Sequence, residues 1–235
     1  MLNRRHFIIS TATLFSPPLA SAAIAQTESE EVEPVVPVRQ PVSPRSKWPI
    51  WDARVTPANY DPFTSNPWGF DPRYLPQIVE ARDNLVPGDI HVDAIARYLY
   101  HIQDNGTAMR YGVAIGRGNL YEPGVYTIRR KVRWPTWRPT DAMIERDPAA
   151  FAQYKDGVDG GPTNPLGSRA LYLYVGNRDT YLRIHGTPSP RSIGSRASSG
   201  CVRMVMAHII GLFDQVELGA TATLYPAEDG IQPHS

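Results

Sequence analysis

The sequence predicts a domain that is mostly β with short helices, extending over residues 87–226. Short runs rich in β-branched and aromatic residues recur along this stretch, which is typical of strands. Turn signals separate some of these runs, and one run near the C-terminus instead repeats its apolar residues at helical spacing. About 140 residues of this kind are enough to enclose one hydrophobic core.

The order of the elements follows from these patterns. The Asp-Asn-Gly-Thr sequence at 104–107 and the Gly-Asn-Arg-Asp sequence at 176–179 each lie between two apolar runs, so each predicts a hairpin. Residues 205–217 predict a helix that ends before Gly219. The expected strands cover residues 90–93, 98–101, 111–115, 124–128, 171–175, 181–185 and 221–225.

Residues 1–25 have the features of a signal peptide, and a twin-arginine export signal is the preferred interpretation. Arg4 and Arg5 precede an apolar stretch that is too short, and too interrupted by prolines, for a permanent membrane anchor. The small residues Ala23 and Ala25 fit a signal peptidase site. We therefore expect an exported, periplasmic protein.

The charge of the mature chain excludes some partner classes. The whole chain has 24 Lys and Arg residues and 23 Asp and Glu residues. Removal of residues 1–25 leaves 22 basic and 23 acidic residues, a net charge of −1. Such a chain has no bulk attraction for nucleic acid or an anionic membrane, so neither is expected as a partner.

Three further segments flank the predicted domain. Residues 26–50 are acidic and then proline-rich, which indicates a tether. Residues 51–86 place many aromatic residues between turn signals, and we expect an irregular arm packed on the domain, with an aromatic platform for sugar rings as the alternative. Residues 227–235 are a C-terminal tail.

Cys201 is the only cysteine, so it forms neither an internal disulfide nor a multi-thiolate metal site. It could be a small apolar core residue, which is common for cysteine. Its neighbours argue against that interpretation, because two serines and a glycine precede it and Arg203 follows. A single thiol in an oxidising compartment is instead a candidate nucleophile.

His185, sixteen residues before Cys201 and at the end of an expected strand, is the candidate general base. It can take the thiol proton or form a thiolate–imidazolium pair with Cys201. The Gly186 carbonyl or Thr187 is expected to orient its ring. The amides of Ser199, Gly200 and Cys201 are candidates for an oxyanion hole, and a helix beginning near Met204 would bring its positive end close to the sulfur.

The region around this pair is rich in arginine and contains no acidic residue between positions 181 and 211. As a group these cations indicate a site that receives carboxylates, although each alone is typical of a solvated surface. The cations are Arg183, Arg191, Arg196 and Arg203. His91, His101 and His208 are interpreted as structural. Neither zinc nor another cofactor is expected, because no Cys/His cluster has ligand spacing.

Several ordered motifs resemble the L,D-transpeptidase catalytic domain family, also called YkuD-like. The resemblance begins with the His-Gly-Thr sequence at 185–187 and the Ser-Ser-Gly-Cys-Val-Arg-Met sequence at 198–204. It extends to segments 111–116, 131–140 and 164–173, and covers about residues 87–226. Two positions depart from the common pattern: Ser199 stands where many members have histidine, and Met206 stands where many have asparagine.

The resemblance implies a β-sandwich domain that remodels peptidoglycan. Such a protein would take part in cell-wall organisation and in maintaining cell shape. Cys201 would attack the bond after the third residue of a tetrapeptide stem, release the terminal D-Ala, and pass the acyl group to an amine. His185 would act as base and then acid, with Gly186 orienting it and Arg203 supporting the site. The loop holding Trp134 and Trp137 would lie on the substrate side. Arg183 and Thr187 are the other expected substrate-binding residues, and carbapenems the expected covalent inhibitors.

Three alternatives remain at this stage. With water as acceptor, the same site would make an L,D-carboxypeptidase or endopeptidase. A catalytically idle wall-binding module is a second possibility, although such relatives often lack the cysteine or the histidine. A papain-like protease is disfavoured, because the histidine precedes the cysteine and the helix start of that family is absent.

Overall fold

The computed structural model describes residues 39–227. The expected signal peptide at 1–25, the tether up to residue 38 and the tail from residue 228 lie outside the described residues. In the described part, no helix is long and apolar enough to cross a membrane.

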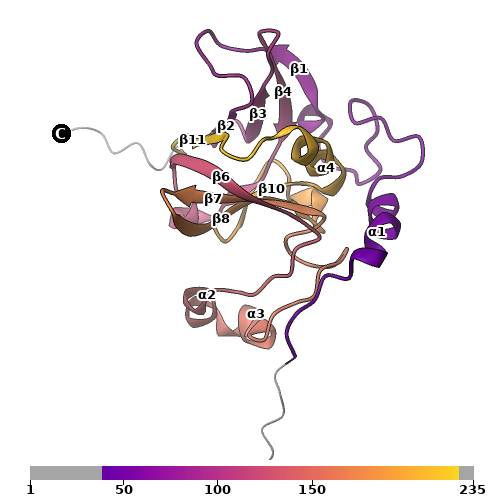
Figure 1. Cartoon of the computed structure of the whole chain (residues 1–235), viewed down its shortest axis with the longest axis vertical. Helices are drawn as coiled ribbons and strands as arrows, with labels where there is room; N and C mark the ends of the chain where they lie inside the picture. The colour runs from indigo at the N-terminus through magenta and orange to yellow at the C-terminus, as the bar shows by residue number, and fades with distance from the viewer. Residues whose placement is uncertain (1–38, 228–235) are drawn as a thin grey trace, which may run out of the picture. The chain divides into compact units, whose positions relative to one another are not determined.

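One large sheet organises the described residues (Figure 1). Its strand order is β1-β4-β3-β2-β11-β6-β7-β8-β10, with parallel pairing only between β2 and β11 and between β8 and β10. A second, two-stranded sheet pairs β5 (Ile115–Gly116) with β9 (Arg196–Ser198). The strands of the large sheet are β1 (Gln77–Glu80), β2 (Ile90–Asp93), β3 (Tyr98–Ile102), β4 (Thr107–Gly112), β6 (Gly124–Arg133), β7 (Arg169–Val175), β8 (Arg178–Thr187), β10 (Val202–Val205) and β11 (Thr221–Leu224).

The predicted fold class, mostly strands with short helices, is confirmed. Both hairpins are present: Gly106 has φ 78° in the β3–β4 turn and Gly176 has φ 57° in the β7–β8 turn. Glycine adopts these left-handed conformations without a steric penalty. The expected strand at 111–115 is instead divided between β4 and β5, because Ala114, beyond the end of β4, exchanges backbone hydrogen bonds with Arg203.

The core is formed by inward-facing residues from both ends of the large sheet and by residues of α4 (Met206–Gln215). Inward-facing residues of β2 and β3 belong to the same buried cluster as those of β7, β8 and β10, so the curved sheet encloses its core as a sandwich does. Helix α4 contributes Ile209, Leu212 and Phe213 from its buried face. At about 25 cal/mol per Å² of apolar surface, such burial is the main stabilising contribution.

The segment 51–86 differs from the expected irregular arm in two elements. Helix α1 (Trp48–Val55) crosses the expected boundary with the tether, and β1 joins the large sheet beside β4. The rest, with a 3₁₀ turn at Pro72–Tyr74, packs Phe70 and Tyr74 against Val205, Ala207 and Ile193. Hydrophobic contact with the domain therefore orders this segment, although its sequence has little helical or strand periodicity.

Helix α1 is attached to the domain by a charged contact. Asp52 accepts two hydrogen bonds from Arg169, at 2.9 Å each, and one from Trp134 Nε1 at 3.0 Å. The Arg169 side chain is fully buried and that of Asp52 is 28% exposed. Arg169 therefore depends on a carboxylate contributed by a distant segment of the chain.

We expect Asp52→Ala to lower the free energy of unfolding by about 3 kcal/mol, because it leaves the buried Arg169 cation unpaired. The matched control is Asp141→Ala, which removes the exposed pair with Arg138 and should cost less than about 1 kcal/mol. Urea unfolding followed by circular dichroism measures both values. Equal losses in the two variants would contradict a structural role for the Asp52–Arg169 pair.

His208 on α4 is buried beneath the arm with an exposed fraction of 2%. Within the described residues neither ring nitrogen has a hydrogen-bond partner. Four rings surround it, with centroids 6.0–6.3 Å away: Tyr60, Trp68, Phe70 and Tyr111. Burial lowers the pKa of His208 to about 3, so the folded protein holds this imidazole neutral.

We expect this histidine to make the fold acid-sensitive. Its pKa is lower in the folded than in the unfolded state, so between about pH 6.5 and 3 the unfolded chain binds more protons and stability falls as the pH falls. His208→Phe should make the dependence shallower by roughly 1.4 kcal/mol per pH unit between pH 4 and 6. Urea titrations at several pH values measure this slope. Parallel pH dependences for the two proteins would contradict the prediction.

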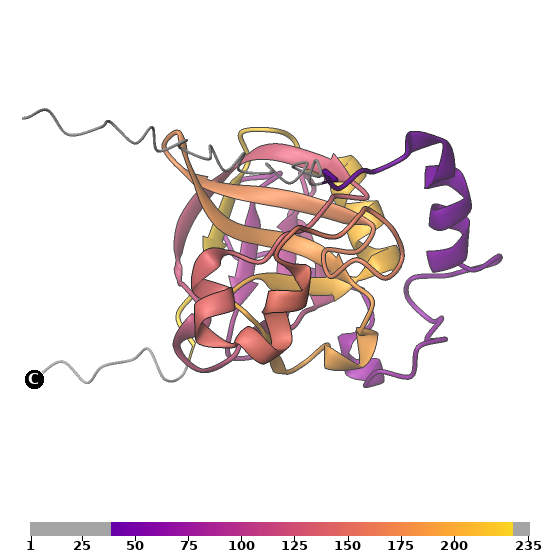
Figure 2. The same cartoon turned by 90° about the horizontal axis from the view of Figure 1, so that it is seen from below.

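The connection between β6 and β7 carries two short helices, α2 (Asp141–Arg146) and α3 (Pro148–Phe151). They lie next to each other in both views (Figure 1 and Figure 2). Thr140 and Asp147 cap their N-termini by accepting from backbone amides. Trp137 packs against Phe151 and Tyr154 at ring distances of 6.4 and 5.8 Å, which ties this excursion together.

Candidate active site

The parallel pairing of β8 and β10 brings the Cys201 and His185 segments together. Arg203 is the register partner of His185, and Met204 is the partner of Gly186. Cys201 directly precedes β10, and its position extends this register to Arg183. Because side chains alternate along strands, Cys201 and Arg203 share a face with Arg183 and His185. The opposite face carries Ile184, Val202 and Met204 into the core.

His185 is 4% exposed, and its Nδ1 lies 2.6 Å from the Gly186 carbonyl oxygen. A carbonyl only accepts, so Nδ1 carries the hydrogen and Nε2 is the unprotonated nitrogen. Burial, with the positive charges of Arg203 and Arg183, lowers the pKa of His185 to about 3, although hydrogen bonds with the backbone of Gly186 and Leu166 oppose this shift. The imidazole is therefore a neutral base at neutral pH.

Cys201 is half-buried, and its Sγ lies 3.8 Å from the Tyr181 carbonyl oxygen. Burial raises the pKa of its thiol above the ordinary value, while a hydrogen bond from the Arg183 amide and the charges of Arg183 and Arg203 act in the opposite direction. A raised thiol pKa together with a neutral imidazole favours proton transfer during attack over a preformed thiolate–imidazolium pair.

The turn before Cys201 is held by Ser198. The Ser198 hydroxyl accepts from the Gly200 amide at 3.2 Å and donates to the Cys201 carbonyl. Gly200 has φ 130°, and a Cβ there would lie 3.0 Å from the Leu120 carbonyl oxygen. The Gly200 amide is thus occupied within the turn, so the amides of Ser199 and Cys201 are the remaining candidate oxyanion donors.

The expectation that a helix dipole acts on the Cys201 sulfur is wrong. Helix α4 begins at Met206 rather than near Met204, and β10 separates it from Cys201. Strand residues advance about 3.3 Å each, which places the helix start on the order of 15 Å from Cys201. The dipole effect falls off within the first turn, so it does not lower the pKa of the thiol.

The expectation that Trp134 binds substrate is not supported, because its side chain is fully buried. Its ring contacts Trp51 edge to face at 5.2 Å, its Nε1 donates to Asp52, and its carbonyl accepts from Ser43. Trp134 therefore attaches the N-terminal segment to the domain. Trp137 is half-buried, and a role in substrate binding stays a prediction.

The arginines of the expected cluster have different environments in the structure. Arg183 forms two hydrogen bonds with Asp179, at 2.6 and 2.9 Å, and its guanidinium lies 3.9 Å above the Tyr172 ring. Because this guanidinium is already paired and 8% exposed, it acts on the site through its charge rather than by receiving a carboxylate. Arg196 donates to the carbonyls of Gly116 and Gly118, and Arg191 is exposed.

Arg203 remains as the cation closest in the chain to Cys201. It is half-buried, its Nε has no hydrogen-bond partner within residues 39–227, and burial lowers its pKa. Arg117 also acts on Arg203 electrostatically, a contribution that sequence reasoning missed. These two cations are better placed than Arg183 to meet a carboxylate.

Residues behind His185 support the end of β8. Gly167 has φ 63°, and a Cβ there would lie 2.7 Å from the Gly186 carbonyl carbon. Ser168 donates to the Met206 carbonyl at 2.9 Å. Thr187 is buried and accepts from the Ser189 amide, so its hydroxyl is engaged in a local turn. Gly167 and Ser168 thus pack closely against the end of β8 and the start of α4, a role that was not assigned to them from the sequence.

Comparison with known families identifies the domain. Residues 87–224 match the model of the L,D-transpeptidase catalytic domain (YkuD). The chain belongs to this family. The L,D-transpeptidase domain contains Cys201 and His185, together with the loop of Trp137, while α1 and β1 precede its matched residues.

Two curated relatives of this L,D-transpeptidase domain come from Escherichia coli K12. The probable L,D-transpeptidase YbiS is 33% identical and the probable L,D-transpeptidase ErfK/SrfK is 31% identical, each over 62% of this chain and 46% of the relative. The chain thus matches less than half the length of these relatives. A solved Brucella melitensis structure, named a probable carnitine operon oxidoreductase, is 51% identical over 64% of this chain and 92% of that one, with a TM-score of 0.46.

Proposed function

We propose that this protein is a peptidoglycan L,D-transpeptidase that works through a thioester on Cys201. The observation that carries the proposal is the position of Cys201 and His185 on one face of β8 and β10, inside the residues that match the family. A nucleophile just before the start of β10 and a neutral base on the adjacent strand β8 suit acyl transfer. The expected signal peptide would place the enzyme in the periplasm, where peptidoglycan is accessible.

In the first half-reaction, His185 takes the thiol proton as Cys201 attacks the carbonyl of the third stem residue. The amides of Ser199 and Cys201 would stabilise the oxyanion. Collapse of the tetrahedral intermediate breaks the peptide bond, and the imidazolium returns its proton to the D-Ala amine that leaves. Arg203 would attract the stem carboxylates, because its half-buried charge lies beside the reacting residues.

In the second half-reaction, an acceptor amine attacks the thioester and Cys201 leaves as thiolate, which regains a proton through His185. A side-chain amine of another stem as acceptor gives a 3→3 cross-link. Water as acceptor would give an L,D-carboxypeptidase instead. The transpeptidase is preferred because the curated relatives carry that name, and carbapenems are expected to acylate the same thiol.

The test is the intact mass of the mature protein after incubation with a tetrapeptide-stem muropeptide and, separately, with a carbapenem. We expect a covalent adduct with each reagent, and dimeric muropeptide among the products. Shortened monomer without dimer would identify water as the acceptor. Folded, reduced protein that forms no adduct and no product would contradict the proposal and favour the idle module.

A further inference from the structure

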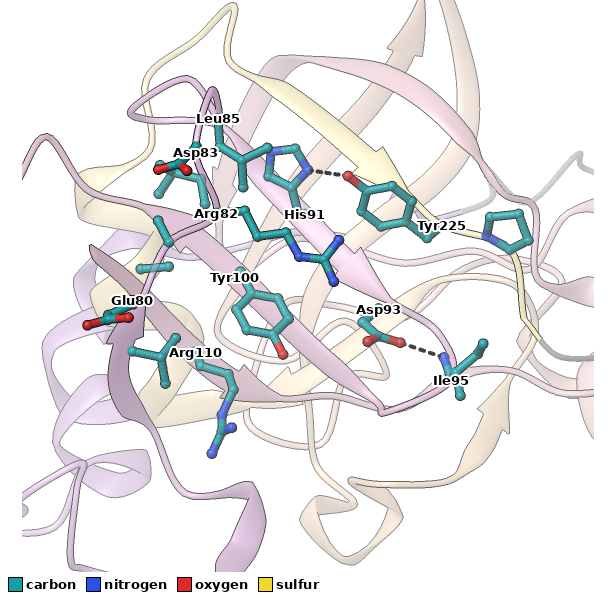
Figure 3. A pocket seen from close by; sticks show the side chains of 15 residues that line it. Glu80, Arg82, Asp83, Leu85, His91, Asp93, Ile95, Tyr100, Arg110 and Tyr225 are labelled. Atoms are coloured by element: carbon teal, nitrogen blue, oxygen red, sulfur yellow. Dashed lines mark hydrogen bonds between the residues drawn. The ribbon is translucent and has the colours of Figure 1, made fainter. Parts of the chain in front are cut away.

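A groove of about 570 Å³ lies on the part of the sheet that is farthest in strand order from β8 and β10. Outward-facing side chains of β2, β3 and β4 form its floor, and residues from the segment 79–85 form a wall (Figure 3). The inward-facing partners Ile90, Val92 and Leu99 belong to the core. The groove is therefore separate from the candidate active site, and none of the site residues lines it.

Aromatic rings and polar groups line the groove. The Tyr225 hydroxyl and His91 Nδ1 share a hydrogen bond of 3.0 Å, and the two rings stack with centroids 5.9 Å apart. Tyr225 is 45% exposed, and Tyr100 lies across the floor from it (Figure 3). Exposed ring faces beside hydrogen-bonding groups suit a ligand with apolar C–H faces and polar edges, which is the form of a sugar ring.

The charged groups of the groove nearly cancel. The lining contains two arginines and three carboxylates, and these residues are Arg82, Arg110, Glu80, Asp83 and Asp93. Such a balance gives no net attraction for a polyanion, but it provides many donors and acceptors for an uncharged ligand.

Some of these groups have no partner in the described part of the chain. The side chains of Arg82, Glu80 and Asp83 make no hydrogen bond or ion pair there. All three side chains are exposed, so their donors and acceptors are available to a bound ligand.

We propose that this groove binds an uncharged, N-acetylated glycan. Tyr100 and Tyr225 stack against the sugar rings, and Arg82 closes over them from the wall while donating to hydroxyl and acetamide oxygens. That the glycan is the peptidoglycan strand rests on the proposed function, since its sugars carry acetamide groups. The groove then holds the polymer while Cys201 reacts with a stem.

The test is a calorimetric titration of the mature protein with N-acetylchitotetraose. We expect Tyr100→Ala and Arg82→Ala each to weaken binding at least tenfold. Phe63→Ala is the control, because Phe63 is an exposed aromatic residue outside the groove, and the variant should bind as the parent protein does. Arg82 is exposed, so its replacement leaves the core intact.

Carbapenem acylation of Cys201, followed by intact mass on the same samples, separates this inference from the proposed function. Acylation unchanged in all variants, with glycan binding lost in the two groove variants, is the expected result. Acylated wild-type protein that does not bind the glycan overturns the inference, as does binding that survives both groove substitutions. Glycan binding without acylation contradicts the proposed function only.

Discussion

Cys201→Ala is expected to abolish stem cleavage and carbapenem adduct formation, with a loss on the order of 10⁴-fold or more in turnover. The reason is chemical: in this mechanism no other group forms the covalent intermediate, and Cys201 is the only cysteine of the chain. Intact mass and muropeptide chromatography measure the loss. The fold should survive, because Cys201 is half-buried in a turn whose hydrogen bonds come from Ser198.

Cys201→Ser is the matched variant, since it replaces the thiol with a hydroxyl of nearly the same shape. Serine has a far higher pKa than cysteine, so the neutral imidazole of His185 activates it poorly and turnover should remain close to that of the alanine variant. Circular dichroism of both variants should match the parent protein. Stem cleavage retained by folded Cys201→Ala protein would refute the mechanism.

His185→Gln is expected to lower the rate of carbapenem acylation by roughly 10²–10⁴-fold, the usual contribution of a positioned general base. Glutamine retains a polar side chain of similar size but accepts no proton at neutral pH. The thiol of Cys201, whose pKa is raised by burial, then has little thiolate available. Intact mass of samples quenched at successive times gives the acylation rate of the parent protein and of the variant.

The pH dependence provides the control for this prediction. With the pKa of His185 lowered to about 3, the base stays unprotonated from about pH 4 upward, so parent activity should not fall between pH 7 and 5 through protonation of this residue. The variant should regain rate only as the pH approaches the raised pKa of the thiol. A parent profile that declines steeply below pH 7 in folded protein would indicate a preformed thiolate–imidazolium pair instead.

Much of the domain could be predicted because its signals are local. Strands at 90–93, 171–175 and 221–225 are short runs of β-formers, and the two hairpins have turn residues that take left-handed backbone conformations. Helix α4 repeats its apolar residues at helical spacing. Each of these features depends on residues that are close together in the chain.

Two residues expected to bind substrate are instead engaged by contacts within the protein. Trp134 resembled a substrate-side aromatic residue, yet Asp52 and Trp51, far earlier in the chain, enclose it. Arg183 was one of a group of apparently available cations, but Asp179, four residues earlier on β8, pairs with it, and Tyr172 on the neighbouring strand β7 lies against its guanidinium. Asp179 is close to Arg183 in the sequence, whereas no sequence window around Trp134 reports the burial of its side chain.

The sequence by itself determined the mostly β fold class, the family, and the two residues on which the proposed chemistry depends. These follow from local propensity and from ordered motifs. Tertiary structure alone decided that β8 and β10 pair in parallel so that Cys201 and His185 share a face, and that β1 extends the sheet. It also decided that burial holds His185 neutral. The physical reason is that desolvation and strand pairing depend on groups far apart in the chain, which meet only when the core forms.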